Sequence, residues 1–333
     1  MNSKHAKSPC CAARIRRFGP RRRQCPLCKR TWTVRPKRRG RPRRRIPLTL
    51  LNEALLNKYT LRQLAQRRAR LALPTFRYRF RQALHRFATR PGPKQLPRGP
   101  LVLLADGLWF QFEGKPWVLY LTALKPCAGQ SAFFLDPLLI AGKEGATRWE
   151  QAFAAIPAQA RARIRALVVD NLRGMHLIAD RRRWVLQLCH FHLILKLQVH
   201  RRGPRRALKG GKVREEIYHL IRNALELPEG PRLKSVLGRL HRLVQTSCGT
   251  RRMQAVVREF LARIKYYRMY QTHPALGLPA TTNTVESMGG IIRDLFRRSR
   301  AASNPRSLLL WATALIRLRP EITCNGKTFN RIN

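Results

Sequence analysis

The sequence predicts an α/β protein built on a mixed β-sheet, with an all-helical insertion before its last helices. Between residues 100 and 200, apolar runs of strand length alternate with amphipathic segments of helix length. From 201 to 280 the pattern is helical throughout. Four of the eight cysteines lie within the first 28 residues, where apolar residues are few. A small cysteine-rich segment therefore precedes the main fold.

The composition favours a nucleic acid as the partner of this chain. Its 333 residues include 69 Lys+Arg and 16 Asp+Glu, a formal net charge of +53. Such an excess of cations attracts polyanions. The 44% apolar content is ordinary for a globular protein. No uncharged run approaches the ~18 residues of a membrane-spanning helix, and the N-terminus lacks the apolar stretch of a signal peptide, so we expect a cytoplasmic protein without membrane association.

Changes in composition divide the chain into regions. Proline and glycine at 91–93 and 97–100 mark a linker between the second region and the third. The predicted regions are a basic cysteine-rich segment (1–45), a helix-turn-helix DNA-binding region (46–90), an α/β core (100–200), a helical insertion (201–280), C-terminal helices carrying Glu286 (281–320) and a tail (321–333).

The first region contains a motif typical of zinc sites. In Cys25-Pro26-Leu27-Cys28 two residues separate the thiols, a spacing at which both can reach one ion. Cys10 and Cys11 are adjacent, so the other half is irregular, and either Cys11 or His5 could supply the fourth ligand. We expect a zinc-ribbon-like segment with structural Zn²⁺. The alternative is a decayed ribbon with bystander thiols.

A basic tract closes the first region. Arg39-Gly40-Arg41-Pro42 resembles the core of an AT-hook, in which arginines enter a narrow A·T minor groove. Arg39 and Arg41 are therefore candidate DNA-binding residues. A solvated basic linker would have the same composition.

The second region contains two predicted helices. Thr60 and Gln63 form a capping box at the start of the first, and the second begins near Thr75. Arg77 and Arg81 project from this second helix, as in a helix-turn-helix that reads DNA. A basic two-helix cover for the core is the alternative. The apolar face of the second helix carries Phe76, Phe80 and Leu84.

The third region is predicted to contain three strands followed by alternating helices and strands. The order βββαβαβα is that of the ribonuclease H-like fold, in which the first and fourth strands lie side by side. That arrangement would bring Asp106 and Asp170 together across 64 residues. The predicted elements are strands at 101–105 with 107–112, 117–123 and 132–140, a helix at 149–164, a strand at 166–169, a helix at 172–180, a strand at 184–188 and a helix at 191–199.

The insertion carries three apolar stripes at helical spacing, which we interpret as core faces. Their outward faces are rich in Arg and Lys, which suits contact with a DNA backbone. The stripes are Ile217, Leu220, Ile221 and Leu225; Val236, Leu237, Leu240 and Val244; and Met253, Val256, Val257, Phe260, Ile264 and Tyr267.

Three acids stand out in a chain that has few. Asp106 and Asp170 each end an apolar run, and Glu286 opens an amphipathic segment. Carboxylates at strand ends and on a helix are the ligands that hard divalent cations need. Simpler interpretations exist, because a strand-end Asp is often a turn residue and Glu286 fits a capping box with Asn283. We interpret four other acids as solvated: Asp136, Glu144, Glu150 and Asp180.

Four motifs taken together resemble the DDE transposases of bacterial insertion sequences, especially the Mutator-like group with an all-helical insertion. Cys189-x-x-His192 follows Asp170 by 19 residues, and Glu286 lies 94 residues beyond His192. The resemblance covers most of the chain and depends on order and spacing together. The motifs are Ala105-Asp106-Gly107, Val168-Val169-Asp170-Asn171, Cys189-His190-Phe191-His192 and Thr282-Asn283-Thr284-Val285-Glu286-Ser287.

The resemblance implies an enzyme that cuts and joins double-stranded DNA at the ends of its own element. Asp106, Asp170 and Glu286 would bind two Mg²⁺ (or Mn²⁺) ions during in-line attack at phosphorus. Cys189 and His192 would support the site; their spacing also fits half of a zinc site, or a buried thiol with a capping imidazole. Pairing two element ends implies a homodimer or larger complex, in the bacterial cytoplasm at the nucleoid.

Two other functions fit parts of the sequence. One is a DNA-binding regulator derived from a transposase, against which the intact set of acids argues. The other is a ribonuclease H-like nuclease, whose usual fourth carboxylate and compact size are not apparent. Asn171 and Arg293 are candidates for contact with the scissile phosphate.

Overall fold

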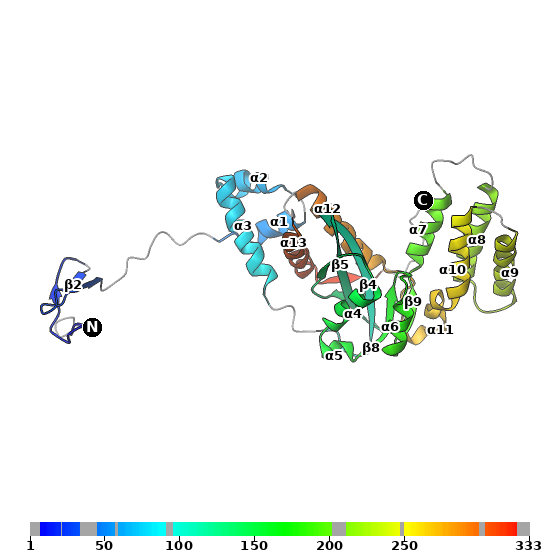
Figure 1. The fold of residues 1–333 in the computed structure, drawn as a ribbon, viewed down its shortest axis with the longest axis horizontal. Helices are drawn as coiled ribbons and strands as arrows, with labels where there is room; N and C mark the ends of the chain where they lie inside the picture. The colour runs from blue at the N-terminus through cyan, green and yellow to red at the C-terminus, as the bar shows by residue number, and fades with distance from the viewer. Residues whose placement is uncertain are drawn as a thin grey trace. The chain divides into compact units, whose positions relative to one another are not determined.

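The computed structural model describes residues 7–20, 22–33, 45–56, 59–90, 96–201, 211–246, 250–299 and 304–324 (Figure 1). The chain divides into two compact units, Met1–Arg45 and Ile46–Asn333, which are described separately. His5, Arg39 and Arg41 lie outside the described residues.

The first unit is a small antiparallel sheet with almost no apolar core. Strands β1 (Arg16–Arg17), β2 (Arg22–Gln24) and β3 (Thr31–Thr33) pair in that order. Among the described residues of this unit, only Ser8 and Cys25 are buried. A unit this small needs a source of stability beyond packing, such as a structural metal.

The second unit is built on a mixed sheet of seven strands in the described part of the chain. Strands β4 (Leu101–Phe112) and β5 (Lys115–Pro126) form a long antiparallel hairpin, which β6 (Ser131–Phe134) extends. On the other side of β4, β8 (Ile164–Val169) and β9 (Val185–Leu188) run parallel to it. The predicted α/β class with a mixed sheet and an N-terminal cysteine cluster is confirmed.

The parallel pairing of β4 with β8 aligns the two aspartates. Leu104 is the register partner of Val168, so Asp106 and Asp170 each follow two residues later. Side chains two residues apart in an extended chain point to the same face. The predicted neighbourhood of the first and fourth strands is confirmed, because β4 and β8 are adjacent.

Prolines divide two of the predicted elements. The strand expected at 132–140 is two strands, β6 and β7 (Leu138–Ala141), because Pro137 between them has no N–H to donate. Both pair with β5, at different positions. The helix expected at 149–164 is α4 (Ala146–Ala154) and a short α5 (Ala158–Arg161), separated at Pro157.

The expected C-terminal tail begins with a strand. Residues Glu321–Thr323 form β10, which pairs antiparallel with β6 at the edge of the sheet. Three residues carry too little periodicity to predict a strand. The strand forms because the outer edge of β6 offers backbone groups with which residues 321–323 can pair.

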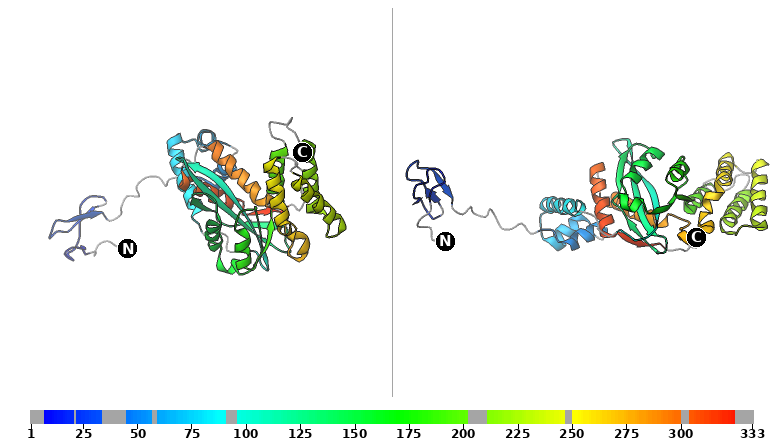
Figure 2. Two further views of the ribbon diagram at one scale, coloured as in Figure 1. Left: turned by 45° about the vertical axis from the view of Figure 1, so that its right-hand side comes forward. Right: turned by 90° about the horizontal axis from the view of Figure 1, so that it is seen from below.

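Helices cover both faces of the sheet. Leu101, Leu103 and Ala105 of β4 pack in one apolar cluster with α4 and with α6 (Met175–Arg181). Leu104 and Leu108, on the other face, pack with α12 (Asn283–Ser299) and α13 (Pro305–Leu318). Figure 2 shows α12, in orange, running along the sheet. Among the described helices, none combines the length and apolarity needed to cross a membrane.

The segment at 46–90 belongs to this second unit. Helices α1 (Leu48–Leu55) and α3 (Leu73–Ala88) pack on α13, with the rings of Phe80 and Trp311 5.5 Å apart. Between them α2 (Leu61–Gln63) continues into a π-helical turn, η2 (Leu64–Ala69). The predicted capping box is confirmed, because Thr60 and Gln63 exchange hydrogen bonds of 3.2 and 2.9 Å.

The insertion is a group of helices attached to β9. Gln187 of β9 is fully buried; its amide donates to the Tyr267 carbonyl and accepts from the Tyr270 N–H. Of the predicted stripes, the first is buried, the second is buried at Leu240, and the third is buried except at Ile264. Helix α7 (His190–Arg201) leads into the insertion, whose described helices are α8 (Gly211–Glu226), α9 (Pro231–Gln245), α10 (Arg251–Tyr267), α11 (Met269–Thr272) and the 3₁₀ turn η3 (Pro274–Leu276).

Helix α12 approaches β4 at a glycine. A Cβ atom on Gly289 would lie 2.7 Å from Cδ2 and 3.2 Å from Cδ1 of Leu108, which is fully buried. A Cβ on the next residue, Gly290, would meet nothing within 4 Å. The close approach at Gly289 therefore sets the depth at which the first turn of α12, with Glu286, lies against the sheet.

We expect Gly289→Ala and Gly290→Ala to change stability in opposite directions. Both gain helix propensity, so Gly290→Ala should raise the free energy of unfolding by about 1 kcal/mol. Gly289→Ala must displace Leu108 or the helix, and should lower it by about 1–3 kcal/mol. Denaturant titration of the two variants tests this. Equal stabilisation by both would show that the contact is not tight.

Candidate functional site

The three acids converge on one imidazole. Asp106 comes from β4, Asp170 from the loop after β8, and Glu286 from the first turn of α12. Oε1 of Glu286 lies 3.3 Å from Nδ1 of His192, and Oδ1 of Asp170 lies 4.0 Å from the same atom. Asp106 is only 8% exposed, and its pKa responds to the charges of His192 and Glu286. The residues that the sequence singled out therefore lie together.

The carboxylate of Glu286 faces the site instead of capping its own helix. Helix α12 begins at Asn283, so Asn283 is the first helical residue and Thr282 precedes the helix. The N–H of Glu286 donates to the carbonyl of Thr282, and its Oε1 accepts a 2.5 Å hydrogen bond from the Thr282 hydroxyl. Thr282 is fully buried and fixes the carboxylate in this direction.

Cys189 lies at the same point, between β9 and α7. Its N–H donates to the Val169 carbonyl, which aligns it with the end of β8. Its sulfur is 3.5 Å from Oε1 of Glu286 and lies 3.1 Å from the Thr282 hydroxyl. Cys189, His192 and Glu286 thus place a sulfur, a nitrogen and an oxygen within 4.8 Å of one another.

Burial controls the protonation of the two enclosed acids. It raises the pKa of Asp106 to about 7, with the charges of Glu286 and Glu144 adding to the rise and those of His192 and Arg293 opposing it. Burial likewise raises the pKa of Glu286 to about 7, against hydrogen bonds from Thr282 and Cys189. A bound cation would favour the charged form of both carboxyls. The arrangement is suited to hold cations.

Glu144, interpreted from the sequence as solvated, is held by two indoles. Its carboxylate accepts hydrogen bonds from Trp109 (3.1 Å) and Trp149 (2.9 Å). It lies against Gly107, where a Cβ would come within 2.6 Å of Oε1. Gly107 follows Asp106, so Glu144 faces the opposite side of β4. A glycine inside a strand, which marks a close approach, was the signal that could have found it.

Two other acids interpreted as solvated form ion pairs. Asp136 pairs with Arg317 of α13 at 2.5 Å. Glu150 of α4 pairs with Arg181 and Arg182, at 2.6 and 2.7 Å.

The insertion contacts the loop that carries Asp170. Asn171 donates its N–H to Oδ1 of Asp170, and its side-chain oxygen accepts a hydrogen bond from Arg263 of α10. A cavity of about 340 Å³ beside this contact is lined by residues that include Asn171, His176, Arg263 and Lys265. Arg263 was not predicted, because nothing near it in the sequence marks a contact 92 residues away.

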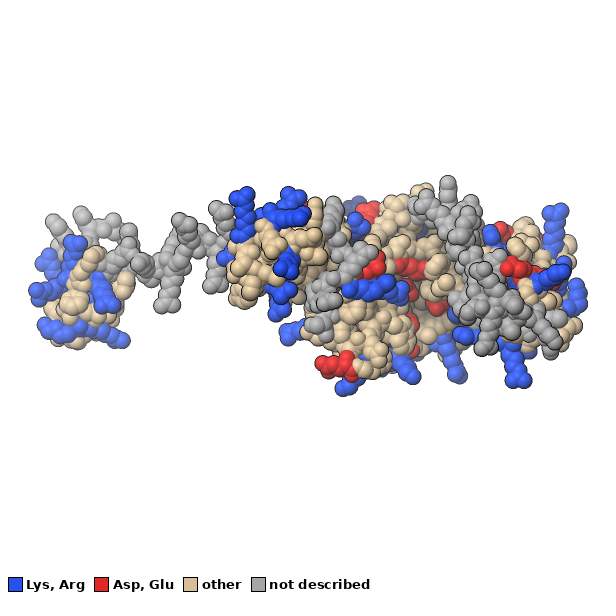
Figure 3. Space-filling model, turned by 90° about the horizontal axis from the view of Figure 1, so that it is seen from above, with Lys and Arg blue, Asp and Glu red and all other residues tan. Residues whose placement is uncertain are grey.

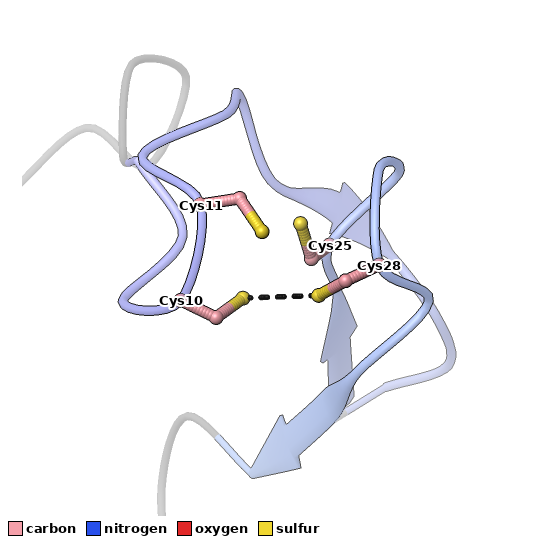
Figure 4. Close-up of side chains that lie close together, drawn as sticks. All are labelled: Cys10, Cys11, Cys25 and Cys28. Atoms are coloured by element: carbon pink, nitrogen blue, oxygen red, sulfur yellow. Dashed lines mark hydrogen bonds between the residues drawn. The ribbon is translucent and has the colours of Figure 1, made fainter.

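The N-terminal thiols form a second cluster, in the first unit. The sulfurs of Cys10, Cys11, Cys25 and Cys28 lie within 4.8 Å of one another and face a common centre (Figure 4). Cys10 and Cys28 approach to 3.4 Å. A hydrogen bond from Ser8 is the main cause that lowers the pKa of Cys25 to about 6. The cluster can hold a metal such as zinc, with Cys11 as the fourth ligand.

No protein-family model matches the chain, and no curated protein matches it. Its function must therefore be argued from the residues themselves.

We expect Cys25→Ser to lower the zinc content of the purified protein by one ion per chain. Cys25 is the buried thiol of the N-terminal cluster, so its loss opens the site. Elemental analysis of the purified variant measures this. Cys127→Ser, at a buried thiol outside both clusters, is the control and should keep the zinc. Unchanged zinc in Cys25→Ser would contradict the assignment.

We expect Asp106→Asn to stabilise the chelator-treated protein at high pH only. A carboxyl whose pKa rises on folding from 3.8 to about 7 contributes stability below pH 4, and this contribution is lost as the pH rises through 7. The amide is neutral throughout, so the advantage of the variant should grow by about 3 kcal/mol between pH 5 and pH 8. Denaturant titrations at pH 5 and pH 8 measure the difference. The exposed Asp180→Asn is the control, and a gain independent of pH would contradict the prediction.

Proposed function

We propose that this protein is a DDE transposase, which cuts and joins DNA at the ends of its mobile element by metal-dependent phosphoryl transfer. The observation that carries the proposal is the convergence of Asp106, Asp170 and Glu286 from three distant segments. These acids come together in a chain of net charge +53, where chance gatherings of carboxylates are least expected.

The strand order supports a ribonuclease H-like core. The order β6-β5-β4-β8-β9 places the first and fourth strands side by side, with an antiparallel meander on one side and parallel strands on the other. That is the arrangement expected for the βββαβαβα order. The helical insertion between α7 and α12 fits the Mutator-like group, whose third acid follows such an insertion.

The three carboxylates fit Mg²⁺, which takes oxygen ligands. Asp106, Asp170 and Glu286 would hold such ions, which would supply activation of the attacking hydroxyl and stabilisation of the leaving 3′-oxygen. The residues of the chain hold and orient these ligands. Thr282 directs Glu286, the N–H of Asn171 holds Asp170, and the pairing of β4 with β8 sets Asp106 beside Asp170.

The distribution of cations supports DNA as the substrate. Arg77 and Arg81 are exposed on α3, beside the buried face that carries Phe76 and Phe80, and α3 would serve as the reading helix of a helix-turn-helix. Lys and Arg side chains project from many parts of the visible surface (Figure 3). Arg293, whose charge acts on both Asp106 and Glu286, is suited to a phosphate near the site.

The position of Glu144 favours a transposase over a ribonuclease H-like nuclease. A nuclease of that fold would be expected to offer a fourth carboxylate to its metal ions. Glu144 faces the other side of β4 and is engaged by two indoles. It therefore does not add a ligand to the three acids.

We expect Asp106→Asn, Asp170→Asn and Glu286→Gln each to reduce strand transfer by more than about a hundredfold, because outer-shell residues alone cost 10–100-fold. The assay uses purified full-length protein, Mg²⁺ and DNA carrying the ends of the element. Asp180→Asn makes the same chemical change at an exposed acid and should retain activity.

Other outcomes of the strand-transfer assay would contradict the proposal in different ways. Joining by all three variants would refute the assignment of the acids. Binding without cleavage by the unaltered protein would favour a DNA-binding regulator, and cleavage without joining would favour a nuclease.

A further inference from the structure

Cys189, His192 and Glu286 have the spacing of ligands around one metal ion. Zinc bonds of about 2.1 Å to nitrogen or oxygen and about 2.3 Å to sulfur put tetrahedral ligand atoms roughly 3.4 to 3.6 Å apart. Oε1 of Glu286 lies 3.3 Å from Nδ1 of His192 and 3.5 Å from Sγ of Cys189. Cys189 and His192 precede the insertion and Glu286 follows it, so the match between these distances and zinc geometry does not come from a local sequence motif.

One of these atoms lacks the hydrogen-bond partner that a buried polar atom normally has, and another is placed to act as a thiolate. Nδ1 of His192 is buried without a hydrogen-bond partner, although a carboxylate oxygen is 3.3 Å away. The sulfur of Cys189 receives the N–H of Thr282 at 3.3 Å, a contact that stabilises a metal-bound thiolate. The Thr282 hydroxyl approaches both Cys189 and Glu286, yet has one hydrogen to donate.

We infer that Cys189, His192 and Glu286 form a binding site for Zn²⁺, which shares Glu286 with the ligands proposed for the catalytic Mg²⁺ ions. Sulfur and imidazole select zinc and cobalt, whereas Mg²⁺ takes oxygen. Binding replaces the proton of the Cys189 thiol by the metal and releases it to solvent. Oδ1 of Asp170, 4.0 Å from Nδ1 of His192, or a water completes the four ligands.

The contacts of Glu286 leave room for both kinds of ion. Its interactions with Thr282, Cys189 and His192 all involve Oε1. Oε2 thus stays available to a second cation. The zinc ion would join the end of β9 and the start of α7 to the first turn of α12, and so fix Glu286. This last role rests on the proposed function, whereas zinc binding does not.

The test is a Co²⁺ titration of the full-length chain in which Cys10, Cys11, Cys25 and Cys28 are replaced by Ser. One equivalent of Co²⁺ should give a near-ultraviolet thiolate-to-metal band, which Zn²⁺ abolishes and millimolar Mg²⁺ leaves unchanged. Adding Cys189→Ser should remove the band, and adding His192→Asn or Glu286→Gln should weaken affinity at least about tenfold. Adding Cys127→Ser, a buried thiol outside the cluster, should change nothing.

A second measurement needs only the four-Ser chain and no substitution at the proposed ligands. X-ray absorption of zinc bound to the same four-Ser chain should give one sulfur and otherwise nitrogen or oxygen ligands. Absence of a thiolate band, its persistence in Cys189→Ser, or zinc without a sulfur ligand would each overturn the inference. DNA and activity enter neither experiment, so failure here is distinct from failure of the proposed function.

Discussion

The burial of two neighbouring carboxyl groups, Asp106 and Glu286, is the constraint on which the other features of the site depend. Asp106 is almost fully buried and Glu286 is largely so, and burial raises the pKa of both. Charged acids in such a place are unfavourable unless cations accompany them. The surrounding structure therefore has to hold the acids rigidly enough that an ion finds its ligands already in position.

Three long-range contacts supply that rigidity. The parallel pairing of β4 and β8 fixes the two aspartates relative to each other. The close approach at Gly289 fixes α12 on β4. Thr282 joins Glu286 to Cys189 and so ties α12 to the end of β9. Each of the three restrains a different element that carries a ligand.

The segments that lead into and out of the insertion meet beside the three acids. His190 starts α7 and donates its N–H to Ala280, just before α12, while its ring contacts the carbonyl of Tyr267 at the end of α10. Arg263 of α10 reaches Asn171, beside Asp170. A nucleic acid bound along the insertion would thus act on the loop that holds an aspartate of the site.

The sequence by itself determined what local periodicity and spacing can encode. The apolar residues along 101–105 and 166–169 indicated two buried strands, and Thr60 with Gln63 indicated the start of a helix. Asp106 and Asp170 could be singled out because each follows an apolar run, but only Asp170 lies at the end of a strand, since Asp106 is inside β4. Cys25 and Cys28 were recognisable from their spacing.

Only the tertiary structure decided the contacts between distant segments. It shows that Cys11 is the fourth thiol of the N-terminal cluster and that Glu144 accepts hydrogen bonds from two indoles. It also shows the contact of Glu286 with Cys189, 97 residues away in sequence. It also added β10 to a free sheet edge. Such contacts depend on where whole elements pack, and packing is governed by complementary surfaces that no short stretch of sequence contains.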